Sequence, residues 1–171
     1  MDSVTAFAPA TVSNVACGFD VLGFALASPG DEVVARPQPS GVAIDDIIGD
    51  NGRLPRAAAR NTAGVAAQAL LTAAGERRGV ALTIRKGLPL ASGLGGSAAS
   101  AAAAVVAVDA LFGLHTPLTT LIACALEGER LGAGSAHADN IAPSICGGFV
   151  LVRSPSPPDI IRLPVPIGLT A

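Results

Sequence analysis

Residues 79–113 hold the pattern that most constrains the fold of this chain. Residues 79–86 are typical of a strand, and the alanine-rich stretch that ends at Gly113 is typical of a helix. The loop between them carries Gly93, Gly95 and Gly96, which allow positive φ and a close approach of the backbone to a ligand. Because the helix opens with small residues, we expect it to pack closely against a sheet.

The junction of this loop and helix has the features of an anion site. Ser97 is placed to act as the N-cap, so the positive end of the helix dipole would face the loop. Backbone N–H groups and a hydroxyl would then hold anionic oxygens without a lysine. A glycine-rich turn with no ligand is the alternative, and the loop by itself does not decide between the two.

Two well-known phosphate loops do not fit the segment. A Walker A loop requires a Lys directly after its glycines, and none follows here. A dinucleotide loop requires G-x-G-x-x-G/A, which Gly93, Gly95 and Ala98 satisfy, but it also needs a second strand ending in an acidic residue about 20 residues on. Gly113 and His115 occupy that place, at the end of a helix. The chain therefore lacks the second strand and the acidic residue that a dinucleotide loop requires.

The rest of the chain favours an α+β fold with a sheet that need not be all parallel. The strand-like runs are 3–8, 21–27, 32–36, 42–48, 148–153 and 160–165. Further helices are predicted at 57–74 and 116–131, and polar loops at 9–20 and 132–140.

Composition excludes several classes of function. The formal net charge is −2 and aromatic residues make up 3% of the chain, so the charge and stacking signatures of nucleic-acid binding are absent. The cysteines Cys17, Cys124 and Cys146 are far apart, which fits a reducing compartment rather than a disulfide framework or a zinc site. No apolar run reaches the roughly 20 residues of a membrane span, and the N-terminus lacks the basic region of a signal peptide. We therefore expect a cytoplasmic protein that binds neither nucleic acid nor membrane.

The glycine-rich loop resembles the P-x-x-x-G-L-G-S-S-A-A signature of the GHMP kinases. The matching residues are Pro89, Gly93, Leu94, Gly95, Ser97, Ala98 and Ala99. Gly96 departs from the signature, since it stands where the first Ser of the pair is usual. A hydroxyl contact to phosphate or magnesium is therefore absent here or replaced by backbone.

Two other segments resemble one branch of this family, the homoserine kinases. Residues 7–23 are similar to that branch's A-P-A-[TS]-x-[AS]-N-L-G-x-G-F-D-x-L-G opening, with Val15 and Ala16 in place of Leu-Gly. Residues 134–149 are similar to its G-S-x-H-x-D-N-V-A-P-x-x-x-G-G-F segment. The three motifs stand in the family's order and cover nearly the whole chain. Without the resemblance, Asn14 and Asp20 would be interpreted as an ordinary Asx turn.

The resemblance implies ATP and Mg²⁺ as cofactors and L-homoserine as the substrate, whose side-chain hydroxyl would be phosphorylated for threonine biosynthesis. It implies catalytic roles for Asn140 and Glu129, metal binding by Glu129 and Ser97, and substrate contacts from Asn14, Asp20 and His137. The nucleotide would contact Asn61, Pro89, Gly93, Leu94, Gly95, Gly96, Ser97, Ala98 and Ala99. Asp139 is a candidate base, although a strong base is not required for phosphoryl transfer. A homodimer is compatible with this interpretation.

The resemblance also implies a domain division. Residues 1–153 would form the N-terminal ATP-binding domain of the ribosomal protein S5 domain 2-like fold, a mixed sheet packed with helices. Residues 154–171 would be the linker and first strand of a C-terminal domain of ferredoxin-like topology that this chain does not contain, and catalysis would then be impaired.

Three alternatives remain open. One is another GHMP kinase of the mevalonate pathway or of the shikimate type, and a second is a nucleotide-binding module without catalysis. A serine hydrolase built from Ser97, His137 and Asp139 is the third, but the chain has no G-x-S-x-G elbow.

Overall fold

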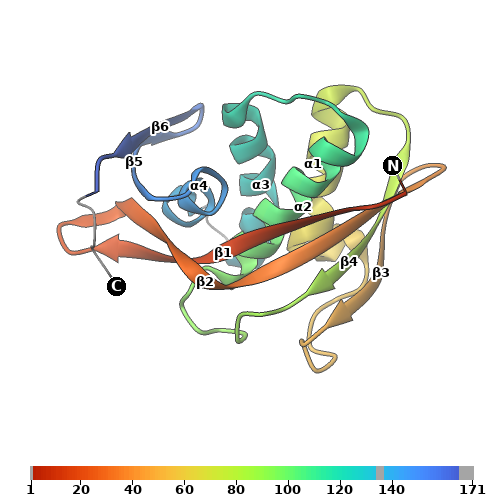
Figure 1. Ribbon diagram of the computed structural model, residues 1–171, viewed down its shortest axis with the longest axis horizontal. Helices are drawn as coiled ribbons and strands as arrows, with labels where there is room; N and C mark the ends of the chain where they lie inside the picture. Colours follow the sequence, from red (N-terminus) through yellow and green to blue (C-terminus); the bar gives the residue numbers. More distant parts are fainter. Residues whose placement is uncertain (1, 134–136, 166–171) are drawn as a thin grey trace.

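The structure, a computed structural model, describes residues 2–133 and 137–165 as a sheet covered by helices (Figure 1). The strands are β1 Val4–Val15, β2 Gly18–Gln38, β3 Val42–Ile48, β4 Gly79–Arg85, β5 Phe149–Pro155 and β6 Pro158–Leu163. The helices are the 3-10 turn η1 Ala58–Arg60, then α1 Thr62–Ala74, α2 Gly96–Phe112, α3 Leu118–Ala133 and α4 Ala138–Cys146.

The six-stranded sheet is mixed, which confirms the predicted α+β class. Its order is β3-β4-β2-β5-β6, and β1 pairs with β2 beside this path. β3 and β4 run parallel, whereas the other neighbours are antiparallel. The long β2 joins both halves of the sheet, because residues 32–38 pair with β4 and residues 22–24 pair with β5.

The predicted polar loop at 9–20 is wrong for most of its length, because β1 and β2 continue through it as one long hairpin. Thr11 faces Ala25 and is fully buried, so its polar groups are satisfied inside the sheet. Register shifts follow Pro9 and Ser13, and Asn14 has a φ of 58°. Such bulges interrupt the alternation that identifies a strand from sequence.

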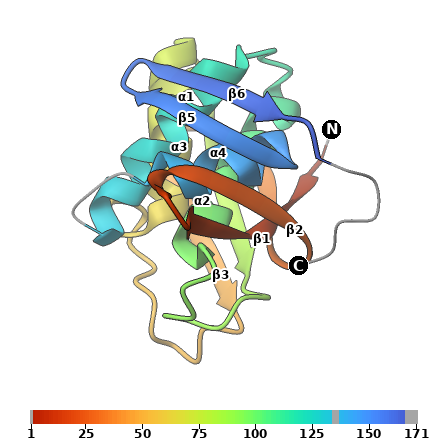
Figure 2. The same ribbon diagram turned by 90° about the vertical axis from the view of Figure 1, so that its left-hand side faces the viewer.

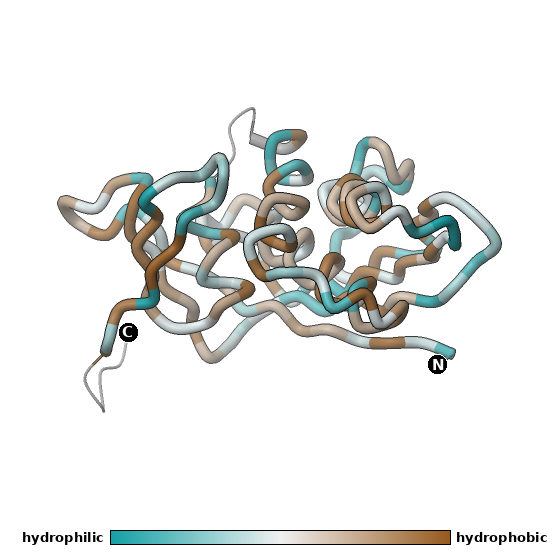
Figure 3. The backbone as a smooth tube through the Cα atoms, turned by 90° about the horizontal axis from the view of Figure 1, so that it is seen from above, coloured by the Kyte–Doolittle hydropathy of each residue, from teal (hydrophilic) through white to brown (hydrophobic). Residues whose placement is uncertain are grey.

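The helix α2 lies at the centre of the fold and contacts α1, α3, α4, β1 and β2. The alanines 101–104 are at most 1% exposed, so neighbouring elements approach this helix closely on several sides. Figure 3 shows apolar residues along the helices, while the most hydrophilic stretches gather in loops and at the ends of elements.

The helix α4 is not predicted from the sequence, which indicates a polar loop at 132–140. Residues 134–136 lie outside the described residues, but α4 begins at Ala138 and continues through Pro143. It packs tightly on β2, since a Cβ at Gly23 would collide with the backbone carbonyl of Asp139. Long-range packing of this kind stabilises a short helix that local sequence does not predict.

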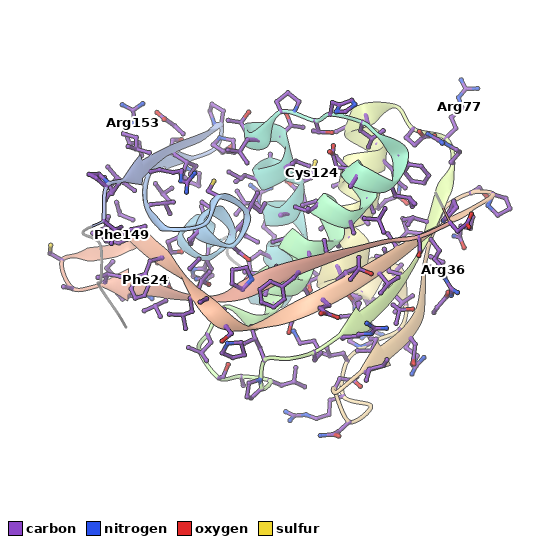
Figure 4. All side chains as sticks on the ribbon, in the orientation of Figure 1. Phe24, Arg36, Arg77, Cys124, Phe149 and Arg153 are labelled. Carbon is purple, nitrogen blue, oxygen red and sulfur yellow. The ribbon has the colours of Figure 1, made fainter. Side chains whose placement is uncertain are left out.

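The β5–β6 hairpin lies beside α4 at one end of the molecule (Figure 2). Phe149 on β5 packs edge-to-face against Phe24 on β2, with ring centroids 6.0 Å apart (Figure 4). β6 pairs with β5, so residues 158–163 belong to the same sheet. The division at residue 153, with residues 154–171 opening a second domain, stays a prediction, and residues 166–171 lie outside the described part of the chain.

Candidate functional site

A cavity of about 550 Å³ lies beside the loop between β4 and α2, the green loop at the foot of Figure 1. Its walls come from residues 53–55, the start of α1, the loop itself and the first turn of α2. Of the sequence-predicted nucleotide residues, those lining it are Asn61, Pro89, Gly93, Gly95, Gly96 and Ser97. Ala98 and Ala99 are fully buried beneath it, so only their backbone could face a ligand.

The helix α2 begins at Gly96 and its N-cap is Gly95, with a φ of 66°. The prediction that Ser97 is the N-cap is therefore wrong, because the helix already starts one residue before Ser97, after a residue in the left-handed region. No side chain caps this end. The first N–H groups of a helix have no partner within it, so this end of α2 can bind anionic oxygens.

Gly95 lies where three elements meet. A Cβ at this position would overlap the Thr11 hydroxyl and stand 2.9 Å from Asn140 Oδ1. The neighbouring backbone is held in place, because Thr11 N–H donates to the Leu94 carbonyl at 3.1 Å. Both the φ and the close approach therefore require glycine here.

Gly96 is in a different environment. Its φ is not positive, and the nearest atoms to a methyl group placed at this position would be Leu88 Cβ at 3.7 Å and Lys86 Nζ at 3.8 Å. The position has room for the hydroxyl that the GHMP signature carries.

Ser97 and Glu129 form the most direct contact between α2 and α3. The Ser97 hydroxyl donates to Glu129 Oε2 at 2.7 Å, and Glu129 is only 5% exposed. Burial raises the pKa of Glu129, although the Ser97 hydrogen bond and the nearby His137 lower it by smaller amounts. Glu129 reaches the cavity through Ser97 rather than lining it itself.

Asn140, from the first turn of α4, lines the cavity and is fixed by β1. Its Oδ1 accepts from the Thr11 hydroxyl at 2.8 Å, and its Nδ2 donates to Ser13 Oγ at 3.1 Å. Asn140 thus links the glycine-rich loop to the tip of the β1–β2 hairpin.

The three predicted substrate residues gather at that hairpin, away from the cavity lining. Asn14 Oδ1 accepts from the Asp20 N–H at 3.1 Å, and Asp20 Oδ1 lies 3.8 Å from His137 Nδ1. Asn14 and Asp20 both have a φ of 58°, a rare conformation that often marks functional sites. The structure therefore brings together residues that are 117 positions apart in sequence (137 − 20 = 117).

Asp139 is buried behind this group, with 1% exposure. Its oxygens lie within 4.8 Å of the ligand atoms of Asp20 and His137. Neither oxygen has a hydrogen-bond partner of normal geometry among the described residues, although the Ser13 hydroxyl is near enough to lower its pKa. Burial is the larger effect and raises the pKa of Asp139.

Asn61 has a structural use of its own. Its Oδ1 accepts from the Ala63 N–H at 3.0 Å and caps α1, while its Nδ2 donates to the Pro55 carbonyl at 3.0 Å. The side chain is buried, yet the residue lines the cavity. Its contact with adenine stays a prediction.

Sequence reasoning missed Lys86 and Asp31. Their side chains are 2% and 0% exposed and form an ion pair beneath the first turn of α2. The sequence carries little signal for them, because Asp31 stands between the strand-like runs 21–27 and 32–36, and Lys86 is the last residue of the run 79–86. The expectation of an anion site formed without a lysine stays a prediction: Lys86 is part of the cavity wall, but its Nζ donates to Asp31, Gly96 and Ser100.

The fold and this site define a class of protein: an α+β domain in which the uncapped N-terminus of a helix lies beside a cavity of about 550 Å³. Residues 61–148 match the GHMP kinases N terminal domain. The chain belongs to the GHMP kinase family.

The individual relatives belong to one branch of this family, the homoserine kinases. The chain is 48% identical to the homoserine kinase of Chlorobium phaeobacteroides (strain BS1), over 99% of this chain and 56% of that protein. It is also 48% identical to the homoserine kinase of Arabidopsis thaliana, over 96% of this chain and 45% of the relative. The chain thus spans about half the length of the relatives it matches.

Solved structures agree with the fold. The homoserine kinase from Cytophaga hutchinsonii superposes with a TM-score of 0.92 at 51% identity, covering 97% of this chain and 53% of the other. The Lactococcus lactis galactokinase crystallised with galactose has a TM-score of 0.70 at 18% identity, over 97% of this chain and 48% of that one, which shows the fold alone. No helix in the described part of the chain is long and apolar enough to cross a membrane.

Proposed function

We propose that this chain is the nucleotide-binding part of a homoserine kinase, which transfers the γ-phosphoryl group of ATP to the side-chain hydroxyl of L-homoserine. The product would be O-phospho-L-homoserine, an intermediate of threonine biosynthesis. The observation that carries the proposal is the position of Asn140, which lines the nucleotide-sized cavity and is hydrogen-bonded through Ser13 to the hairpin that bears Asn14 and Asp20.

On the nucleotide side, the N–H groups of the glycine-rich loop and of the first turn of α2 would bind the phosphates. Ser97 and Glu129 offer oxygen ligands, which fits the preference of Mg²⁺ for hard donors. A bound Mg²⁺ would neutralise charge on the transferring phosphoryl group. Glu129 would have to be ionised for this role; burial raises its pKa and opposes that form, whereas the Ser97 hydrogen bond and a bound cation favour it.

On the acceptor side, the negative charge is arranged for an ammonium group. Asp20 is exposed and lies beside His137, and an oxygen of the buried Asp139 lies within 4.8 Å of their ligand atoms. A substrate amine bound there would leave its side chain free to extend toward Asn140. Asn140 would hold the attacking hydroxyl in line with the phosphoryl group, and such positioning supplies most of the catalysis in phosphoryl transfer.

The remaining expectations belong to the same proposal. A domain after residue 153 would complete the acceptor site, the protein would act in the cytoplasm, and a homodimer is compatible with the described surface. No nucleic-acid or membrane partner is proposed.

The test is ADP release from Mg-ATP by the 171-residue chain, with L-homoserine, with mevalonate and without an acceptor. Homoserine-dependent release that disappears in Asn140→Ala supports the proposal, with Gln68→Ala, on the exposed face of α1, as the matched control. Release with mevalonate instead would favour another kinase of the family. Nucleotide binding without turnover for any acceptor would favour a non-catalytic module for this chain.

A further inference from the structure

A buried polar network stands directly under the candidate phosphate site. It comprises Asp31 on β2, Lys86 at the end of β4 and Ser100 on α2. Residues with charged side chains are rarely so fully buried unless they are paired, and burial of an ion pair does not by itself stabilise a fold. The network therefore calls for a reason other than stability.

Asp31 uses both carboxylate oxygens to hold the start of the glycine-rich loop and α2 together. Oδ1 accepts from the N–H groups of Gly87 and Leu88 at 3.0 and 3.1 Å. Oδ2 accepts from Lys86 Nζ and, at 2.7 Å, from the Ser100 hydroxyl. A single side chain on β2 thus fixes both ends of the loop.

Lys86 completes the connection. Besides Asp31, its Nζ donates to the Gly96 carbonyl at 2.8 Å and to Ser100 Oγ at 2.9 Å, so all three of its N–H donors are used. These bonds fix the orientation of the peptide group of Gly96, the first residue of α2.

The location of Lys86 is unfavourable for the helix alone. A cation near the N-terminus of a helix opposes the helix dipole, whereas the same cation favours an anion bound in front of that terminus. Lys86, Gly96 and Ser100 all line the cavity. The paired Asp31 carboxylate offsets part of this cost, and an anion bound in the cavity would offset more of it.

We propose that Asp31 and Lys86 are positioning residues for the nucleotide phosphates: their hydrogen bonds to the Gly87 and Leu88 N–H groups and to the Gly96 carbonyl hold the loop so that the N–H groups at the start of α2 face the phosphate oxygens. The inference rests on the proposed function, because it assigns these residues to the same nucleotide site. Neither residue needs to touch the nucleotide.

The test compares Mg-ADP and adenosine binding by calorimetry with thermal unfolding, for the 171-residue chain and its variants. Lys86→Met and Asp31→Asn each leave one buried charge unpaired, so each lowers the melting temperature. We expect each to weaken Mg-ADP binding by about 10- to 100-fold, the range caused by small misplacements of a site. Adenosine has no phosphate, and its affinity should not change.

The double variant separates positioning from stability. Lys86→Met with Asp31→Asn contains no unpaired charge, so its melting temperature should recover toward that of the wild type. Its Mg-ADP affinity should stay low, because the bonds to Gly96 and Ser100 are still missing. Recovery of both quantities together, or loss of adenosine binding as well, would show a merely structural role and overturn the inference.

Two further variants guard against misfolding and surface effects. Ser100→Ala removes one hydroxyl and should weaken Mg-ADP binding by about two- to tenfold, the worth of one hydrogen bond. Arg85→Met changes the β4 residue next to Lys86 and breaks its exposed 3.2 Å pair with Glu32 of β2, and it should change neither affinity. Unchanged Mg-ADP affinity in Ser100→Ala and in the double variant overturns the inference while the nucleotide site stands. Absence of Mg-ADP binding by the wild type overturns both proposals.

Discussion

The Ser97 hydroxyl on α2 lies 2.7 Å from the buried carboxylate of Glu129 on α3, beside the cavity where the glycine-rich loop ends. The contact joins the uncapped N-terminal turn of α2 to a carboxylate that water scarcely reaches. Such a carboxylate is poorly solvated as an anion, so a bound divalent cation would gain strongly from it.

Glu129→Gln should preserve the fold and remove the magnesium dependence of ADP binding, because glutamine keeps the shape and the Ser97 contact but not the charge. The measurement is ADP affinity by calorimetry with and without Mg²⁺. Glu127→Gln, on the same helix but exposed and paired with Arg130, is the matched control. An unchanged response to Mg²⁺ in Glu129→Gln would rule out Glu129 as a ligand.

The pKa values of Glu129 and Asp139 predict how stability depends on pH. Both are raised by burial, from ordinary values of 4.5 and 3.8, so the folded protein binds these protons more tightly than the unfolded chain. Their contribution to the free energy of unfolding is therefore greatest at acidic pH and falls as pH rises from those ordinary values through the raised ones.

Denaturant unfolding across this pH range should show the decline in the wild type. The double variant Glu129→Gln with Asp139→Asn should lose that part of the slope, because neither amide titrates. An identical pH profile for the two proteins would contradict the assigned shifts.

Gly95→Ala and Gly96→Ala should have opposite effects on the free energy of unfolding. The first places a Cβ on Thr11 and forces alanine into positive φ, so a loss of about 2 kcal/mol or more in unfolding free energy is expected. The second makes ordinary van der Waals contacts with Leu88 and Lys86 at the first position of a helix and should gain about 0.5 kcal/mol in unfolding free energy. Equal stabilities in chemical denaturation would refute the geometry at Gly95.

Asn61→Asp and Asn61→Ala separate capping from the contact with Pro55. Aspartate keeps the acceptor for the Ala63 N–H, whereas alanine loses it and should cost about 1 kcal/mol in unfolding free energy. If Asn61 also contacts adenine through Nδ2, both variants should weaken adenosine binding. Adenosine affinity equal to the wild type in both variants would limit Asn61 to capping.

Local sequence predicts the helices and strands whose hydrophobic periodicity is uninterrupted. β3 and β4 and the alanine-rich α2 agree closely with their predicted ranges, because patterning and glycine punctuation specify them. The β1–β2 hairpin is predicted only in pieces, because bulges after Pro9 and Ser13 interrupt its alternation. α4 is not predicted because it is short, and the packing of its backbone on Gly23, rather than its local sequence, stabilises it.

The candidate site likewise contains residues that the sequence predicts and residues that it does not. Motif resemblance predicts the loop residues and the grouping of Asn14, Asp20 and His137. It does not predict Lys86 and Asp31, since they are 55 positions apart and belong to no motif. Only the pairing of β2 with β4 brings them together, and that pairing is a property of the whole sheet.

The most direct test of the central claim is an amide chemical-shift titration with Mg-ADP. The account predicts that the largest shifts fall on residues 93–99, at the end of the loop and the first turn of α2, and that adenosine leaves Gly96 and Ser97 nearly unmoved. Shifts concentrated instead on the separate groove lined by Val65, Gln68 and Ala69 would contradict it.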